Sequence, residues 1–291
     1  ALCMLIGLMA GCAESDPTPS PSADPQNTGS IADPSDNSQK EDRKGGEITI
    51  PTSMFISSMV PWEVTAKGGW VTMEPAIEHL GRLNLDGSVT PFLAEEFIED
   101  AENNTLTIKL REGIKFSDGS DFNADVLVWT LEQFIASGKD AEVCSPSKFE
   151  ATDEYTVVMY FDSYANDRLE TLSQVHIMSQ KAFEENGGEW AATNPIGTGA
   201  FVVESYELGH SIVYAARDDY WQDGLPYLDK ITFMLMTDTN TQLTAFINGE
   251  LDIFSASTGA HMAQVEALTG VKKISSESGI RATQQYFLVN S

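Results

Sequence analysis

Basic residues are scarce in this 291-residue chain. It has 17 Lys and Arg residues against 44 Asp and Glu residues, which gives a formal net charge of −27 at pH 7. Binding to nucleic acid or to anionic lipid head groups requires clustered Lys and Arg, so the composition argues against both. The charge of a small ligand stays open, because a cleft can differ from the surface as a whole. A solvated acidic surface that keeps an exported protein soluble is the favoured explanation of this composition, and an acidic, halophile-like proteome is the alternative.

Cysteine and histidine are also few. The three cysteines are Cys3, Cys12 and Cys144, and they form no C-x-x-C pair. The four histidines are His79, His176, His210 and His261. They show neither i,i+4 nor H-E-x-x-H spacing, so each is interpreted as a surface or core residue. The sequence also lacks a G-x-S-x-G elbow and a P-loop, so we expect no catalytic residue, no metal site and no cofactor.

No apolar run approaches the roughly 20 residues that a membrane-spanning helix needs. The longest lies at 1–10 and is followed by Gly11 and Cys12. The segment Met9–Cys12 resembles the lipobox of a bacterial lipoprotein signal peptide, in which the Cys is acylated. We therefore expect residues 1–12 to be the remnant of such a signal, with lipidation at Cys12. Residues 13–45, rich in Pro, Ser and Asp, are predicted to form a disordered tether.

The rest of the chain alternates short strand patterns with helical ones, which predicts an α/β fold. Strands are expected at 47–51, 105–110, 156–161, 201–206, 211–216, 231–236 and 251–254. Helices are expected at 71–83, 124–137 and 239–248. On the first helix Met73, Ile77 and Leu80 share one stripe. On the last, Leu243, Phe246 and Ile247 share one face.

Gly197 and Gly199 flank Thr198 immediately before the strand at 201–206. A dinucleotide fingerprint would need a third glycine at position 202, which is Val, and a helix rather than a strand afterwards. We therefore predict a tight turn with at least one of the two glycines at positive φ, because glycine adopts that region without strain.

Several segments together resemble one protein family. They are Gly45–Pro51, Val89–Glu96, Leu110–Val126, Asn194–Phe201, Arg217–Trp221, Pro226–Asp229 and Asn248–Ile253. In order and spacing they are similar to the family 5 extracellular solute-binding proteins, which are oligopeptide- and dipeptide-binding receptors of ABC importers. The resemblance extends from about residue 46 to about residue 290.

The resemblance implies a type II, family 5 periplasmic-binding-protein-like fold. Residues 46–291 would form its first lobe, with a core subdomain at 46–63 and 181–291 and an inserted subdomain at 64–180. The second lobe would lie outside this sequence, which we interpret as a fragment. The implied partners are ABC permease subunits and a membrane reached through the lipid anchor. We expect a monomeric, extracytoplasmic protein at the cell surface or in the periplasm.

A peptide is the solute that the resemblance favours, since its main chain can be bound by β-type hydrogen bonds. Nickel, haem and oligosaccharide are alternatives within the family. A secreted hydrolase and a surface adhesin are alternatives outside it.

The ligand site is predicted from the fold, because ligands of α/β sheets bind beyond the carboxyl ends of the strands. The candidates are Thr52, Ser53 and Met54 after the first strand, Ser255, Ala256 and Ser257 after the strand at 251–254, and Tyr286 near the last strand. A plain surface loop, or a core aromatic for Tyr286, is the alternative at each position.

Overall fold

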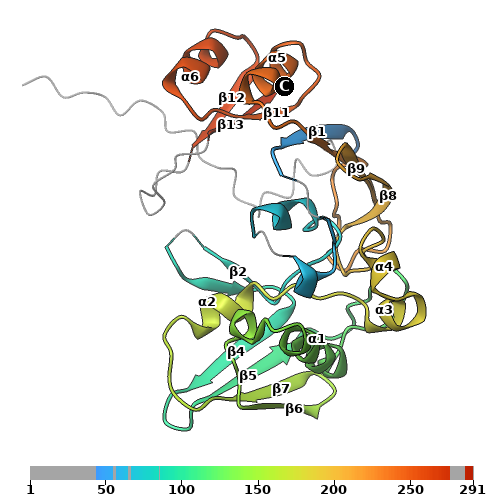
Figure 1. The fold of residues 1–291 in the computed structure, drawn as a ribbon, viewed down its shortest axis with the longest axis vertical. Coiled ribbons are helices and arrows are strands. Elements are labelled where there is room, and N and C mark those ends of the chain that lie inside the picture. The colour runs from blue at the N-terminus through green and yellow to red at the C-terminus, as the bar shows by residue number, and fades with distance from the viewer. Residues whose placement is uncertain (1–43, 55–56, 65–66, 85, 276–285, 291) are drawn as a thin grey trace, which may run out of the picture. The chain divides into compact units, whose positions relative to one another are not determined.

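The computed structural model describes residues 44–54, 57–64, 67–84, 86–275 and 286–290 (Figure 1). The lipidation candidate Cys12 and nearly all of the predicted tether lie outside these ranges. Within them, no helix combines the length and the apolar character that a membrane crossing requires. The subdomain boundaries at 63/64 and 180/181 stay a prediction.

One four-stranded sheet carries the first strand of the fold. Its strands are β1 (Glu47–Thr52), β10 (Lys230–Leu235), β9 (Ser211–Ala216) and β8 (Phe201–Glu207), in the order β1-β10-β9-β8. Strand β1 pairs in parallel with β10, whereas β8, β9 and β10 form antiparallel pairs. The strands predicted at 47–51, 201–206, 211–216 and 231–236 are confirmed.

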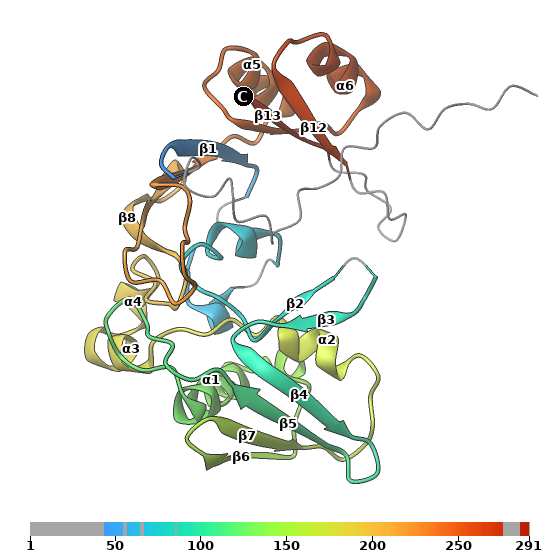
Figure 2. The same ribbon diagram turned by 180° about the vertical axis from the view of Figure 1, so that it is seen from behind.

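A second four-stranded sheet is wholly antiparallel (Figure 2). In the order β4-β5-β7-β6 its strands are β4 (Ala94–Asp100), β5 (Thr105–Leu110), β7 (Thr156–Tyr160) and β6 (Lys148–Asp153). Along β5 the side chains of Leu106, Ile108 and Leu110 are buried, as the alternation in the sequence predicts.

Helix α1 (Ala124–Ala136) packs against β6 and β7. It begins where predicted, because the Asn123 side chain accepts a hydrogen bond from the Val126 backbone N–H at 3.1 Å. Trp129 is buried on this helix, with its ring centroid 5.2 Å from that of Trp62. It is therefore a core residue.

The last part of the chain builds a small sheet with two helices. Its elements are α5 (Thr239–Ile247), β11 (Ile253–Ser255), α6 (Gly259–Glu266), β12 (Val271–Ser275) and β13 (Tyr286–Asn290), and the strand order is β11-β13-β12. Helix α5 buries Leu243 and Phe246 as predicted. Ile247 is 45% exposed, so its predicted place on the buried face is wrong. It is the last helical residue and is not part of the small core that Leu243 and Phe246 form.

The remaining elements are short. They are η3 (Pro61–Glu63), η4 (Lys67–Thr72), β2 (Gly81–Leu83), β3 (Val89–Pro91), η5 (Asp140–Val143), α2 (Arg168–Ser173), α3 (Gln180–Asn186) and α4 (Gly188–Ala191). Strands β2 and β3 form an antiparallel hairpin.

The helix predicted at 71–83 does not form. Turns occupy the residues after η4, and the segment ends in strand β2. The carbonyl of Pro75 accepts a hydrogen bond from Phe201 N, and that of Ala76 accepts one from Gly199 N. These carbonyls are thus bonded to another segment instead of to a helix. The three apolar residues Met73, Ile77 and Leu80 are all buried. Their spacing therefore predicted burial correctly, but the helix predicted from it was wrong.

The prediction of positive φ at Gly197 or Gly199 is also wrong, since neither is among the residues with that conformation. Both are needed for a close backbone approach. A Cβ on Gly197 would lie 2.0 Å from the Ala76 carbonyl oxygen, and one on Gly199 would lie 2.3 Å from the Pro75 carbonyl oxygen. Only glycine fits against this backbone.

Candidate ligand-binding site

The parallel strands β1 and β10 end side by side, where the first candidate residues lie. The Thr52 carbonyl accepts a hydrogen bond from Met236 N at 2.8 Å. The Thr52 hydroxyl is turned inward and donates to the Met54 carbonyl at 2.7 Å. Ser53 and Met54 are exposed, with Met54 at 43%. Thr52 therefore shapes the loop, and the other two present their side chains on its surface.

Strand β11 lies beside β1. The backbone N–H of Asp252 donates to the Thr49 carbonyl at 3.0 Å, and the Asp252 carboxylate accepts from Thr49 N at 2.6 Å. This pair lies three residues before Thr52 on one strand and three before Ser255 on the other. The fold therefore brings together two of the chain segments from which the site was predicted.

The candidates after β11 differ in exposure. Ser255 is half-buried, Ala256 is buried and Ser257 is exposed. A ligand contact at Ala256 would thus involve its main chain. The Ser257 hydroxyl lies 3.4 Å from His261 Nδ1, on helix α6.

Tyr286 begins β13, whose next residue, Phe287, pairs with Ser255. Its backbone is therefore close to the β11 candidates in register. Its side chain lies outside the described part of the structure.

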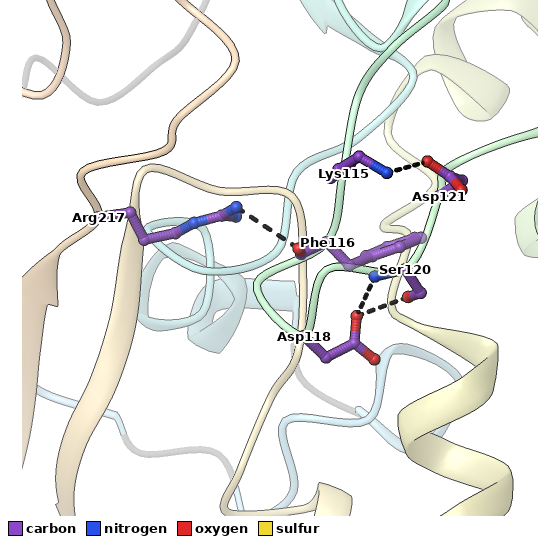
Figure 3. Close-up of polar contacts among 6 residues, drawn as sticks. All are labelled: Lys115, Phe116, Asp118, Ser120, Asp121 and Arg217. Atoms are coloured by element: carbon purple, nitrogen blue, oxygen red, sulfur yellow. Dashed lines mark hydrogen bonds and ion pairs between the residues drawn. The ribbon is translucent and has the colours of Figure 1, made fainter.

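The strongest sequence motifs turn out to hold the fold together (Figure 3). Buried Arg217 donates to the carbonyls of Gly197 and Gly199, at 3.4 and 3.2 Å, and to that of Phe116 at 3.5 Å. In the loop that carries Phe116, the Asp118 carboxylate accepts hydrogen bonds from the backbone and hydroxyl of Ser120. These contacts give the Gly, Arg and Asp residues of the motifs structural roles in the fold.

Glu78 is the centre of a second group of structural hydrogen bonds. We call it the Glu78 anchor, and the Arg217 contacts the Arg217 anchor. Its carboxylate accepts hydrogen bonds from the Thr198 hydroxyl at 2.9 Å, the Tyr220 hydroxyl at 2.6 Å and the Trp221 indole N–H at 2.9 Å. Burial raises the pKa of Glu78, and the three hydrogen bonds act in the opposite direction. The anchor joins the Gly197 turn to the Tyr220–Trp221 motif and has no feature of a reactive site.

One feature was missed by the sequence interpretation. A cavity of about 360 Å³ is lined by residues that include Trp70, His79 and His176. The two histidines are far apart in the chain and have no motif spacing, so only the fold reveals that they meet. Within the described ranges, no group of three or more His, Cys, Asp or Glu side chains is placed to hold a metal ion.

The fold and these anchors define an α/β lobe of the periplasmic-binding-protein type. The family model for bacterial extracellular solute-binding proteins, family 5 Middle, matches residues 88–291. The chain belongs to this family. The predicted family and fold class are therefore confirmed.

Similar proteins include the glutathione-binding protein GsiB of Salmonella typhi, 27% identical over 218 residues, and that of Shigella boydii, 29% identical over 212 residues. Each match covers 70% of this chain and 41% of the relative. The chain thus spans less than half the length of these relatives.

Solved structures show the same fold. The periplasmic binding protein DppA of Helicobacter pylori, in complex with the peptide STSA, has a TM-score of 0.72 and 21% identity, with 81% of this chain and 52% of that one covered. The ABC transporter substrate-binding protein CtaP of Listeria monocytogenes has a TM-score of 0.71 and 26% identity, with 80% and 49% covered.

Proposed function

We propose that the protein is the extracytoplasmic receptor of an ABC importer, which binds a small solute and delivers it to permease subunits. The observation that carries this proposal is the family match over residues 88–291. The motif residues at the Arg217 and Glu78 anchors are engaged in structural hydrogen bonds, which agrees with a protein that binds rather than reacts.

A peptide-like solute is proposed as the ligand. The GsiB relatives are glutathione-binding proteins, and the H. pylori DppA structure holds a peptide. Main-chain hydrogen bonds would allow one site to accept peptides of different sequence. The alternatives are nickel, haem, an oligosaccharide or a hydrolase substrate. A binding screen that includes these compounds would detect any of them as the ligand.

We place the solute at the edge where β1 and β11 end, with Ser53, Met54, Ser255 and Ser257 as contact residues. Thr52, Ala256 and Tyr286 complete the candidate set. The support is the Thr49–Asp252 contact, which holds the two strands together.

The variant Ser255→Trp tests this placement in the protein at its full natural length. We expect the affinity for a peptide or glutathione to fall at least about tenfold, about 1.4 kcal/mol, with little change in melting temperature. Isothermal titration and thermal melts measure both quantities. Ser147→Trp is the matched control, because Ser147 is exposed and immediately precedes β6 of the other large sheet. Equal affinity in Ser255→Trp and the control would remove this edge from the site.

Lipid anchoring is proposed from the Met9–Cys12 segment alone. Expressed in bacteria behind a complete signal peptide, the protein should incorporate labelled fatty acid and partition into detergent. Cys12→Ser should abolish both, while Cys144→Ser should change neither, since Cys144 is partly buried at the end of η5. A wild-type protein without label would refute the anchor and leave solute binding untouched.

A further inference from the structure

The loop after β11 presents Ser257 to solvent immediately before helix α6. Ser257 is exposed and comes one residue before Thr258, which is the N-cap of that helix. Its hydroxyl lies 3.4 Å from Nδ1 of His261, one helical turn further along the chain. Within the part of the chain that the structure describes, this ring is the one hydrogen-bond partner of the hydroxyl. The state of the ring therefore determines what the hydroxyl offers to a solute.

His261 is held at three points that do not involve Ser257. Its Nε2 lies 3.3 Å from the side-chain carbonyl oxygen of Asn240, on helix α5. Its ring packs against that of buried Phe254, with centroids 6.0 Å apart and planes at 71°. Its backbone N–H donates to the Thr258 hydroxyl at 3.2 Å. The half-buried ring thus connects α5 and β11 to the start of α6, and the fold sets its orientation.

The contact with α5 decides which ring nitrogen carries the proton. The carbonyl oxygen of Asn240 can only accept a hydrogen bond, so Nε2 of His261 must donate. A neutral imidazole has a single N–H. Nδ1 therefore has a lone pair and accepts a hydrogen bond from the Ser257 hydroxyl. The proton of that hydroxyl is used in this bond, while its oxygen can still accept from another donor.

A hydroxyl in this state favours one kind of solute group. It accepts hydrogen bonds and has no proton left to donate, so it suits an N–H donor. A carboxylate or carbonyl oxygen would meet a lone pair there instead of a hydrogen. A peptide offers N–H donors in its main-chain amides and in its terminal ammonium group.

We propose that His261 is a positioning residue that holds the Ser257 hydroxyl as an acceptor for an N–H group of the solute. The inference rests on the proposed receptor function and on the placement of the solute at the edge where β1 and β11 end. It adds two residues, Asn240 and His261, that determine affinity without touching the solute.

Titrations of the protein at its full natural length test the proposal as a double-mutant cycle, with glutathione and trialanine as probes. Ser257→Ala removes the acceptor. His261→Phe keeps a ring against Phe254 and removes both ring nitrogens. Each single variant should bind a probe about fivefold more weakly than the wild type, the effect of one ordinary hydrogen bond. The double variant should also be about fivefold weaker, because His261 acts through Ser257, whereas independent effects would multiply to about 25-fold.

Two further variants define the effect. Asn240→Ala removes the acceptor that fixes the proton on Nε2, so it should weaken binding in the wild type and not in Ser257→Ala. Tyr164→Phe is the control, because it removes a polar group from an exposed ring that precedes α2, outside the β11-β13-β12 sheet. It should bind with wild-type affinity, and all variants should keep nearly the wild-type melting temperature.

The proton position can be measured without a ligand. In ¹⁵N spectra of histidine-labelled protein, recorded at a pH where the ring is neutral, His261 should carry its proton on Nε2. Its Nδ1 resonance should move in Ser257→Ala, because the hydrogen bond to that nitrogen is lost.

The N-acetylated form of the probe that binds distinguishes the two sources of the N–H group. A fivefold difference between wild type and Ser257→Ala that persists with the acetylated probe would indicate a main-chain amide. Disappearance of the difference would indicate the ammonium group.

The proposal is overturned if Ser257→Ala or His261→Phe binds like the wild type, if the two losses multiply in the double variant, or if the proton of His261 is on Nδ1. In each of these cases a wild type that binds a probe leaves the receptor function standing. A folded wild type that binds neither probe would reject the proposal together with the proposed peptide-like ligand.

Discussion

Gly197→Ala is expected to lower the free energy of unfolding by about 3 kcal/mol or more. The new Cβ would lie 2.0 Å from the Ala76 carbonyl oxygen, and that oxygen belongs to backbone that is itself hydrogen-bonded to Gly199. Neither partner can move without breaking this bond. Urea unfolding followed by tryptophan fluorescence measures the loss.

Gly259→Ala is the matched control for this substitution. A Cβ on Gly259 would meet no atom within 4 Å, and this glycine, the first residue of α6, has no positive φ. Alanine has a higher helix propensity than glycine, so the control should be neutral or slightly stabilising. Wild-type stability of Gly197→Ala would contradict the close-contact explanation. Loss of ligand binding at unchanged stability would show that the Gly197 turn belongs to the site.

Glu78→Ala is expected to destabilise the fold by at least about 3 kcal/mol. It removes the acceptor of three donors, the buried Thr198 hydroxyl and the part-buried donors of Tyr220 and Trp221, and a buried donor left unpaired costs about 1–3 kcal/mol. Glu78→Gln keeps one carbonyl oxygen and a similar shape, so it should lose clearly less. Chemical unfolding of the two variants beside the wild type gives the comparison, and equal losses would mean that the oxygen and the shape kept by Gln contribute no stability here.

The difference in stability between the wild type and Glu78→Gln should depend on pH. Burial raises the pKa of Glu78, so the folded state binds this proton more tightly than the unfolded state does. Stability from this group is therefore present below its unfolded pKa and decreases as the pH rises through the folded pKa. The stability of the wild type relative to Glu78→Gln should fall over that window.

The elements that the sequence predicted correctly are those with local causes. Strands β8 and β9 follow from β-branched and aromatic runs, and α1 follows from its Asn123 cap and apolar spacing. The segment at 71–83 failed because its partner is distant in the chain. Its carbonyls bond to Gly199 and Phe201, which no local pattern could reveal.

The glycines of the 197–199 turn also depend on a tertiary contact that the sequence does not reveal. Their position in a turn was predictable, but the reason for glycine is contact with the backbone at 75–76 and not a positive φ. The candidate ligand-binding residues and the cavity also differ in whether local sequence could predict them. The ends of β1 and β11 could be named from strand order, whereas the meeting of His79 and His176 depends on a tertiary contact between two segments without a motif.

The most direct test of the receptor function is isothermal titration of the protein at its full natural length with glutathione and with a mixture of short peptides. We expect saturable binding of at least one of these solutes with a dissociation constant below about 1 mM, which corresponds to more than about 4 kcal/mol of binding free energy. The absence of saturable binding, in a protein whose melting curve shows that it is folded, would contradict it.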